Sequence, residues 1–245
     1  MSDALAVAGL HAGYGAGDIL KGVDVALAAG SIVTLIGPNG SGKSTLIKTL
    51  AGLLPAREGE MRLCGARLNE LSAPQRVRAG LAYVPQEYNV FRNLTVLENL
   101  KIAREFMGGG GAPPLDEVTA LFPELRPRFK ALAGNLSGGQ RQMLAFACAL
   151  TVRPKVLMLD EPSAGLSPKY IGEIFATVKQ VNAMGVSVLM VEQNAIEALR
   201  ISDTCVVLAG GRVRLAAPAG EVLGMKDLQS LYLGDAQQVN GRAAA

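Results

Sequence analysis

Residues 37–45 have the spacing G-x-x-x-x-G-K-[ST], which is typical of a loop that binds phosphate. A short apolar run at 31–36 precedes this loop and helical apolar spacing at 43–54 follows it, so it is predicted to join a strand to a helix. Backbone N–H groups of such a loop converge on phosphate oxygens, and the helix N-terminus adds positive potential. A glycine turn with an incidental lysine is the alternative, and the flanking elements disfavour it.

The side chains of this loop predict a nucleotide site. Lys43 is expected to contact the β and γ phosphates, and the Ser44 hydroxyl is expected to coordinate Mg²⁺. The predicted phosphate-binding residues are Gly37, Pro38, Asn39, Gly40, Ser41, Gly42, Lys43, Ser44 and Thr45.

Two adjacent acidic residues, Asp160 and Glu161, follow a second buried apolar run at 155–160. The carboxyl ends of parallel strands form the edge where open α/β sheets bind ligands. We therefore expect Asp160 to face Mg²⁺ and Glu161 to face the attacking water. Adjacent acids after a strand are equally typical of a helix N-cap. The phosphate loop upstream favours the catalytic interpretation.

The segment 136–140 has the sequence L-S-G-G-Q and leads into a predicted helix at 141–152. Ser137 can cap that helix, while Gly138 and Gly139 expose further backbone donors. Taken alone, the segment is a weak signal, because an ordinary N-cap with glycines has the same pattern. Two anion-binding helix starts and one nucleotide indicate a site shared between two chains.

Strands and helices alternate along much of the chain, which predicts an α/β fold with a mainly parallel sheet. Two early alternating runs predict an antiparallel β layer joined by a glycine-rich turn. A third buried run predicts another parallel strand, and two runs around Gly210 and Gly211 predict a hairpin. In order, the runs are 4–10, 22–27, 186–191, 204–208 and 212–216.

The stretch 95–150 changes to helical periodicity, broken by a glycine- and proline-rich loop at 107–114. A further helix, between the second and third buried strands, is predicted from apolar residues spaced three and four apart. Its apolar stripe consists of Ile171, Ile174, Phe175, Val178 and Val181.

Composition excludes several classes of protein. The 245 residues are 49% hydrophobic, enough for a sizeable core in one large domain or two small ones. A net charge of +3 and 4% aromatic residues disfavour a nucleic-acid partner. One histidine, His11, and three dispersed cysteines disfavour zinc sites, a Ser-His-Asp triad and a disulfide framework. The chain has no apolar run of the ~18 residues needed to span a bilayer.

Together, the three motifs make the chain resemble the nucleotide-binding subunits of ATP-binding cassette (ABC) transporters, from about residue 5 to about residue 234. The resemblance implies the ABC-type P-loop NTPase fold as a single domain, 1–245. That fold has a mainly parallel sheet, an N-terminal antiparallel β layer and an inserted helical lobe at about 88–152. Residues 235–245 are predicted to be a frayed tail.

The resemblance also implies a head-to-tail dimer in which two subunits enclose ATP and Mg²⁺. By this resemblance Tyr14 stacks on adenine, and Gln86 contacts Mg²⁺ or water and senses a membrane subunit. The implied metal ligands are Ser44, Gln86 and Asp160. The implied contacts to the opposing γ-phosphate are Ser137, Gly138, Gly139 and Gln140, with Arg141 or Gln142 in support.

Two positions depart from the family pattern. Ser167 stands where an aspartate is usual, and Gln193 stands where a switch histidine is usual. A glutamine still donates a neutral hydrogen bond but cannot become cationic beside the γ-phosphate. The catalytic residues implied are therefore Glu161 as general base, with Lys43 and Gln193.

These departures, with the segments 121–125, 191–194 and 232–234, resemble the ATPases of branched-chain, hydrophobic amino acid importers. Urea and short-amide importers have similar features. Residues 84–91 resemble lipopolysaccharide-export ATPases, although Gln193 and Ser167 disfavour that branch. A nucleotide-gated regulatory module with little turnover is the alternative from another class.

The resemblance implies transmembrane permease subunits as partners and, indirectly, a solute-binding protein. It is compatible with a homodimer or with a heterodimer containing a sister ATPase. The expected location is the cytoplasm, peripherally on the inner face of the cell membrane.

Overall fold

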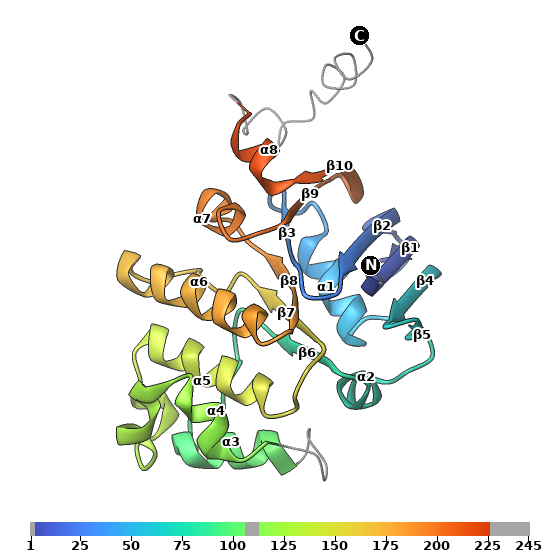
Figure 1. Ribbon diagram of the computed structural model, residues 1–245. Coiled ribbons are helices and arrows are strands. Elements are labelled where there is room, and N and C mark those ends of the chain that lie inside the picture. Colours follow the sequence, from blue (N-terminus) through green and yellow to red (C-terminus); the bar gives the residue numbers. More distant parts are fainter. Residues whose placement is uncertain (1–2, 106–112, 226–245) are drawn as a thin grey trace.

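The computed structural model describes residues 3–105 and 113–225, whose strands form two sheets (Figure 1). In spatial order, the larger sheet contains β10 (Arg212–Pro218), β9 (Thr204–Ala209), β3 (Ile32–Ile36), β8 (Ser187–Val191), β7 (Val156–Asp160) and β6 (Leu81–Val84). The strands from β9 to β6 are parallel, and β10 pairs antiparallel with β9. The predicted α/β class, parallel sheet and C-terminal hairpin are therefore confirmed.

The smaller sheet is antiparallel throughout. Its strands, in spatial order, are β2 (Leu20–Ala28), β1 (Asp3–Ala12), β4 (Glu58–Leu63) and β5 (Ala66–Arg67). The predicted N-terminal antiparallel layer is confirmed. It also includes β4 and β5, for which the sequence pattern gave no prediction.

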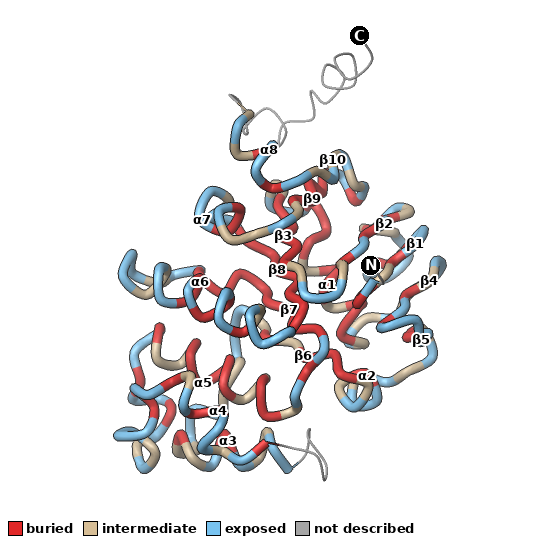
Figure 2. Tube along the Cα trace, in the orientation of Figure 1, coloured by how far each residue is buried: buried red, intermediate tan, exposed pale blue. Residues whose placement is uncertain are grey.

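The central strands β3, β7 and β8 are buried along their whole length (Figure 2). Alternate side chains of β7 enter two different cores: Leu157 and Leu159 pack with the helical lobe, while Val156 and Met158 pack toward the smaller sheet. Strands covered on both faces require continuous apolar runs, which is why they were predictable. Each is one residue shorter at its start than predicted.

Helix α1 (Lys43–Ala51) shares a core with both sheets, whereas α6 (Pro168–Ala183) packs in the other core with the helical lobe. The predicted extent 43–54 was wrong at its end. Gly52 adopts φ 81° and its N–H bonds to the carbonyls of Lys48 and Thr49, which closes the helix before Pro55.

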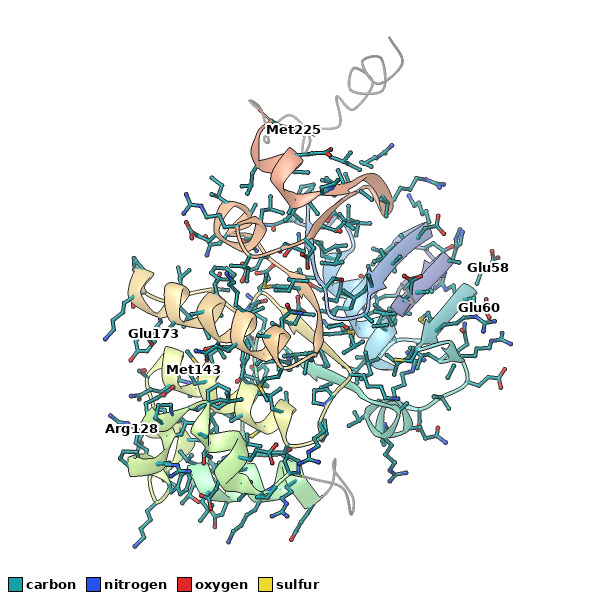
Figure 3. The ribbon with its side chains drawn as sticks, in the orientation of Figure 1. Glu58, Glu60, Arg128, Met143, Glu173 and Met225 are labelled. Carbon is teal, nitrogen blue, oxygen red and sulfur yellow. The ribbon has the colours of Figure 1, made fainter. Side chains whose placement is uncertain are left out.

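The helical lobe contains α3 (Val96–Ala103), α4 (Leu115–Ala120) and α5 (Gly138–Leu150), with 3₁₀ turns at Pro123–Arg128 and Ala133–Asn135. Figure 1 shows it beside the β6 edge of the larger sheet. The helix predicted at 141–152 begins earlier than expected, because Ser137 caps it, and it ends at Leu150. Met143 of α5 (Figure 3) packs in one core with Ile174 and Val178 of α6, which joins the lobe to α6.

The remaining helices are α2 (Ala73–Ala79), α7 (Ala195–Leu199) and α8 (Ala219–Leu223). None of the helices in 3–105 and 113–225 has the length and apolar character needed to cross a bilayer. Most of the predicted 107–114 loop, the 232–234 segment and the 235–245 tail lie outside the described residues. The assignment of 1–245 to a single domain stays a prediction.

A buried arginine fixes the C-terminal end of α1. The Arg76 guanidinium donates to the carbonyls of Thr49 at 2.6 Å and Leu50 at 2.8 Å, and its Nε donates to Leu71 O at 2.9 Å. Burial lowers the pKa of Arg76. A cation at a helix C-terminus also complements the helix dipole. Arg76 therefore stabilises the helix whose opposite end begins at the phosphate loop.

Arg76→Met is expected to lower the free energy of unfolding by about 2 to 3 kcal/mol, since hydrogen bonds from a charged donor to buried carbonyls are lost. Urea denaturation measures the change. Arg78→Met removes an exposed arginine from the same helix and is expected to change stability by less than about 0.5 kcal/mol. Equal effects of the two variants would contradict the role given to Arg76.

Candidate active site

The predicted phosphate loop runs from the end of β3 to the start of α1. Gly37 must be glycine, because a Cβ there would lie 2.0 Å from the carbonyl oxygen of Leu208 in β9. Gly42 caps α1 without a side chain, so it leaves the first-turn N–H groups of that helix available to an anion. Of the remaining loop residues, Ser41 and Thr45 are buried, Pro38 and Ser44 are half-buried, and Asn39 and Gly40 are exposed.

The turn between β9 and β10, at Gly210 and Gly211, contacts this loop. Gly211 N donates to Ser41 O at 3.1 Å, and Gly211 O accepts from Lys21 N of β2 at 2.8 Å. A Cβ at Gly211 would lie 1.8 Å from Ile19 O, so only glycine fits between these segments. The loop conformation therefore depends on a residue about 170 positions away in sequence (Gly211 against Ser41).

Lys43 is 5% exposed and folds back over the loop. Its Nζ donates to Gly37 O at 2.7 Å and to Pro38 O at 3.1 Å. Burial lowers the pKa of Lys43, and the nearby carboxylates of Glu161 and Asp160 oppose that change. The ammonium is thus held beside the loop and within the field of both acids.

Asp160 ends β7 with a buried carboxylate. Its Oδ2 accepts a hydrogen bond from the Tyr83 hydroxyl at 3.3 Å, while its Oδ1 is buried with no hydrogen-bond partner among the described residues. Burial, followed by repulsion from Glu161, raises the pKa of Asp160. Burying an unpaired carboxylate oxygen is costly unless a ligand satisfies it. A hard oxygen donor beside a phosphate loop fits Mg²⁺.

Glu161 lies at the meeting point of three segments. Its Oε1 and Oε2 accept from Gln193 Nε2 at 2.9 and 2.8 Å, and Oε2 accepts from Gln86 Nε2 at 3.2 Å. The structure therefore brings together three residues that were predicted separately. Glu161 also has φ 48°, a left-handed conformation that is strained for a residue with a side chain and that occurs often at active sites.

The segment 136–140 is placed differently. Ser137 caps α5, with Gln140 N donating to Ser137 Oγ at 3.3 Å and Ser137 N donating to Gln140 Oε1 at 3.1 Å. Ser137 Oγ also lies 3.4 Å from the Tyr170 hydroxyl of α6. Within the part of the chain that the structure describes, no hydrogen bond joins this segment to the phosphate loop. The two helices whose starts could bind anions belong to different parts of the fold, because α1 packs in the core with both sheets and α5 packs in the core of the helical lobe (Figure 1).

Tyr14 is 53% exposed, on the turn after β1. Three contacts that the sequence pattern did not reveal stabilise this turn. Arg57 donates to Gly15 O at 2.5 Å and to Asp18 Oδ1 at 2.7 Å, and His11 Nδ1 lies 3.1 Å from Asp18 Oδ2. Hydrogen bonds from His11 and then Arg57 lower the pKa of Asp18. His11 thus supports the turn and is not part of the group around Glu161.

Comparison with known proteins identifies the family. The ABC transporter family model matches residues 20–164. The chain belongs to the ABC transporter family. It is an ATPase of the ABC type, with the fold and the motifs of that family.

Two ABC relatives are similar over nearly the whole chain. A probable branched-chain amino acid transport ATP-binding protein, LivF, from Archaeoglobus fulgidus is 44% identical, covering 92% of this chain and 96% of the relative. A high-affinity branched-chain amino acid transport ATP-binding protein, BraG, from Pseudomonas aeruginosa is 42% identical, covering 90% and 95%.

A solved ABC structure is also similar. It is a dimeric ATP-binding cassette in a post-hydrolysis state, bound to ADP and phosphate. It has a TM-score of 0.78 and 25% identity, and the match covers 88% of this chain and 98% of that cassette.

Proposed function

We propose that this ABC ATPase powers an importer of branched-chain or other hydrophobic amino acids. The observation that carries the proposal is the separation of the two anion-binding helix starts on one chain, which makes the site complete only with a second subunit. The transport proteins that are 42% and 44% identical support the choice of solute. Gln193 and Ser167 favour the same branch over lipopolysaccharide export.

The residues around the phosphate loop have distinct roles in the proposed hydrolysis. The loop N–H groups and Lys43 bind and orient the β and γ phosphates. Ser44, Gln86 and Asp160 would hold Mg²⁺, which when bound neutralises charge on the phosphate oxygens. Glu161 accepts the proton of the water that attacks the γ-phosphate.

Gln193 orients the base. Its two hydrogen bonds to Glu161 hold the carboxylate in one place, and its neutral carboxamide does not compete for the proton. Gln86 approaches the same carboxylate from the segment after β6, so a movement of that segment would change the position of the base.

The second subunit supplies residues 137–140 to the nucleotide held by the first. Their capped helix start offers backbone N–H groups to the γ-phosphate, as an N-terminus does to an anion. The solved cassette with ADP and phosphate is dimeric, which supports this arrangement. Either a second copy of this chain or a sister ATPase could occupy that position.

A groove beside Gln86 is the site we propose for the permease. A cavity of about 470 Å³ lies between β6, α3 and α5, with a mainly apolar lining. Phe91, at its edge, is 61% exposed, and the neighbouring Tyr88 is 91% exposed with φ 55°. Such an exposed apolar patch fits an amphipathic helix of a membrane subunit. Binding there would place the chain at the inner face of the membrane and next to Glu161.

The experiment that tests the proposal is reconstitution with the membrane subunits that co-purify with this chain. Proteoliposomes are assayed for uptake of leucine, with urea and acetamide as competing solutes, in the presence and absence of ATP. ATP-dependent leucine uptake is expected. Uptake of urea or the amide alone would overturn the choice of solute. ATP binding without solute-linked turnover would favour the regulatory module.

Binding of the permease to the groove is tested separately, by co-purification. Phe91→Ser is expected to reduce co-purification of the permease while leaving ATP binding by the free chain intact. Met184→Ser removes another exposed apolar side chain, which does not line the groove, and is the matched control. Equal co-purification of both variants with the permease would contradict the docking site.

Gln193→His is expected to keep ATP turnover within about one order of magnitude of the unmodified chain, because an imidazole N–H can also donate to Glu161. Gln193→Ala removes the donor and is expected to lower turnover further than the histidine variant. Steady-state phosphate release measures both. If Gln193→His lost turnover while keeping its melting temperature, Gln193 would not be a neutral substitute for the usual histidine.

A further inference from the structure

Glu192 has a nearly inaccessible carboxylate just beyond β8. The residue is 1% exposed, and its carboxylate accepts four hydrogen bonds. Oε1 accepts from Ser163 N at 2.9 Å, and Oε2 accepts from Ser163 Oγ at 2.9 Å. Oε2 also accepts from Gln193 N at 3.0 Å and Asn194 N at 3.2 Å. The mechanism proposed above does not use this carboxylate.

The chemistry of these contacts selects an ionised carboxylate. All four partners donate, and an ionised carboxylate is the side-chain group that accepts at both oxygens and donates nothing. No ion pair among residues 3–105 and 113–225 includes Glu192. Burial raises the pKa of Glu192, and the hydrogen bonds from Ser163, Asn194 and Gln193 oppose that rise. The donors, rather than a counter-ion, therefore hold the charge.

The four donors come from two segments that both lead to Glu161. Ser163 lies two residues after Glu161, and Asn194 Nδ2 donates to Ser163 Oγ at 2.7 Å, which closes a ring with Glu192. On the other side, Gln193 follows Glu192 directly and donates its carboxamide to Glu161. The Glu192 carboxylate thus fixes the start of the 163–167 loop relative to the side chain that orients the base.

The same loop reaches the segment 136–140. Beyond the buried Ser163, residues 164 and 165 are exposed. A Cβ at Gly138 would lie 3.4 Å from Leu166 Cδ2, so the far end of the loop packs on the capped start of α5. A continuous series of contacts therefore runs from Gly138 through Leu166 and Ser163 to Glu192, and from there through Gln193 to Glu161.

We propose that Glu192 is a positioning residue for ATP hydrolysis. It couples the start of α5, which contacts the nucleotide held by the other subunit, to the general base Glu161 of its own subunit. This inference rests on the proposed function. The hydrogen bonds of the Glu192 carboxylate, which is 1% exposed, all go to Ser163, Gln193 and Asn194. Glu192 acts by holding Ser163 and the backbone of Gln193 in one geometry, so that the Glu161 carboxylate stays aligned.

The test uses the full-length chain and separates binding from turnover. Glu192→Gln keeps the size of the side chain but turns one acceptor into a donor facing other donors. We expect kcat to fall by about 10-fold to 100-fold, the scale of losses from a misplaced group. The affinity for a fluorescent ATP analogue is expected to stay within about twofold, because the phosphate loop is untouched. Glu197 of α7 forms an exposed ion pair with Arg200. Glu197→Gln is the matched control and is expected to leave kcat unchanged.

The kcat of a double variant tests whether Glu192 acts through Gln193. If it does, adding Gln193→Ala to Glu192→Gln should lower kcat little beyond the more impaired single variant, since coupled residues are not additive. Losses that multiply would overturn the inference, as would a kcat for Glu192→Gln equal to that of Glu197→Gln.

A milder variant covers the case in which Glu192→Gln does not fold. Ser163→Ala removes one donor hydroxyl and leaves the backbone N–H, so the fold is retained; kcat is expected to fall with unchanged nucleotide affinity. An unchanged kcat for Ser163→Ala would overturn the inference. Turnover of the unmodified chain no higher than that of Glu161→Gln would instead overturn the proposed hydrolysis, which separates the two failures.

Discussion

Glu161→Gln is expected to lower ATP turnover by a factor of about 10² to 10⁴, the contribution of a positioned general base. The variant has almost the same shape, so the φ 48° backbone and the surrounding contacts need not change. Its carboxamide oxygen can still accept from Gln193, but the group cannot take a proton from water. Hydrolysis fails while ATP binding persists.

A second consequence follows from the shared site. If hydrolysis is blocked while ATP still binds, the ATP-bound pair of subunits is expected to accumulate, since binding to the associated state stabilises it by mass action. Phosphate release measures the turnover, and size-exclusion chromatography with and without ATP measures the association. Glu173→Gln, on the exposed face of α6 (Figure 3), is the matched control. Equal turnover in the two variants would remove Glu161 from the role of base.

Lys43→Ala is expected to weaken nucleotide binding by about 100-fold or more, because each charge-assisted hydrogen bond lost is worth about 1.5 to 3 kcal/mol. Lys43 Nζ donates to Gly37 O and Pro38 O, so the ammonium is already positioned beside the loop. A bound nucleotide would accept these hydrogen bonds through its phosphates. Turnover at ordinary ATP concentrations should fall to background.

Equilibrium titration with a fluorescent ATP analogue measures this loss directly. Lys179→Ala removes an exposed lysine from α6 and is expected to bind like the unmodified chain. A folded Lys43→Ala protein that bound nucleotide with unchanged affinity would refute the phosphate site. The two large predictions are complementary, because one variant loses binding and the other loses only the chemical step.

The sequence predicted the central strands β3, β7 and β8, but neither β4 nor β6. In β4, Met61 and Leu63 are buried, while Glu58 is exposed and Glu60 is partly exposed at the outer edge of the smaller sheet (Figure 3). Two apolar residues in a charged stretch are too few to establish a two-residue period. Pairing with β1 supplies the rest of the stabilisation, and this partner is more than 50 residues away (Leu5 opposite Leu63).

The same limit applies to the site. The phosphate loop is visible from its spacing alone. Glu161 was predicted from its place after a buried strand downstream of that loop, and Gln193 from the resemblance to a family. Glu192 and Arg57 act through contacts at long sequence separation, to Ser163 and to Gly15. Nothing in the local pattern marks them, because a charged residue beside a motif is most often solvated. Only the folded arrangement distinguishes a buried carboxylate with four donors from an exposed one.

The hairpin turn behind the phosphate loop has a consequence for biosynthesis. Residues 37–45 leave the ribosome early, yet Gly37 is fitted against Leu208 and Ser41 is held by Gly211. A nascent chain shorter than about 211 residues has the complete motif and lacks the strands that shape it. We therefore expect nucleotide to bind only late in synthesis, and truncated products should not sequester ATP.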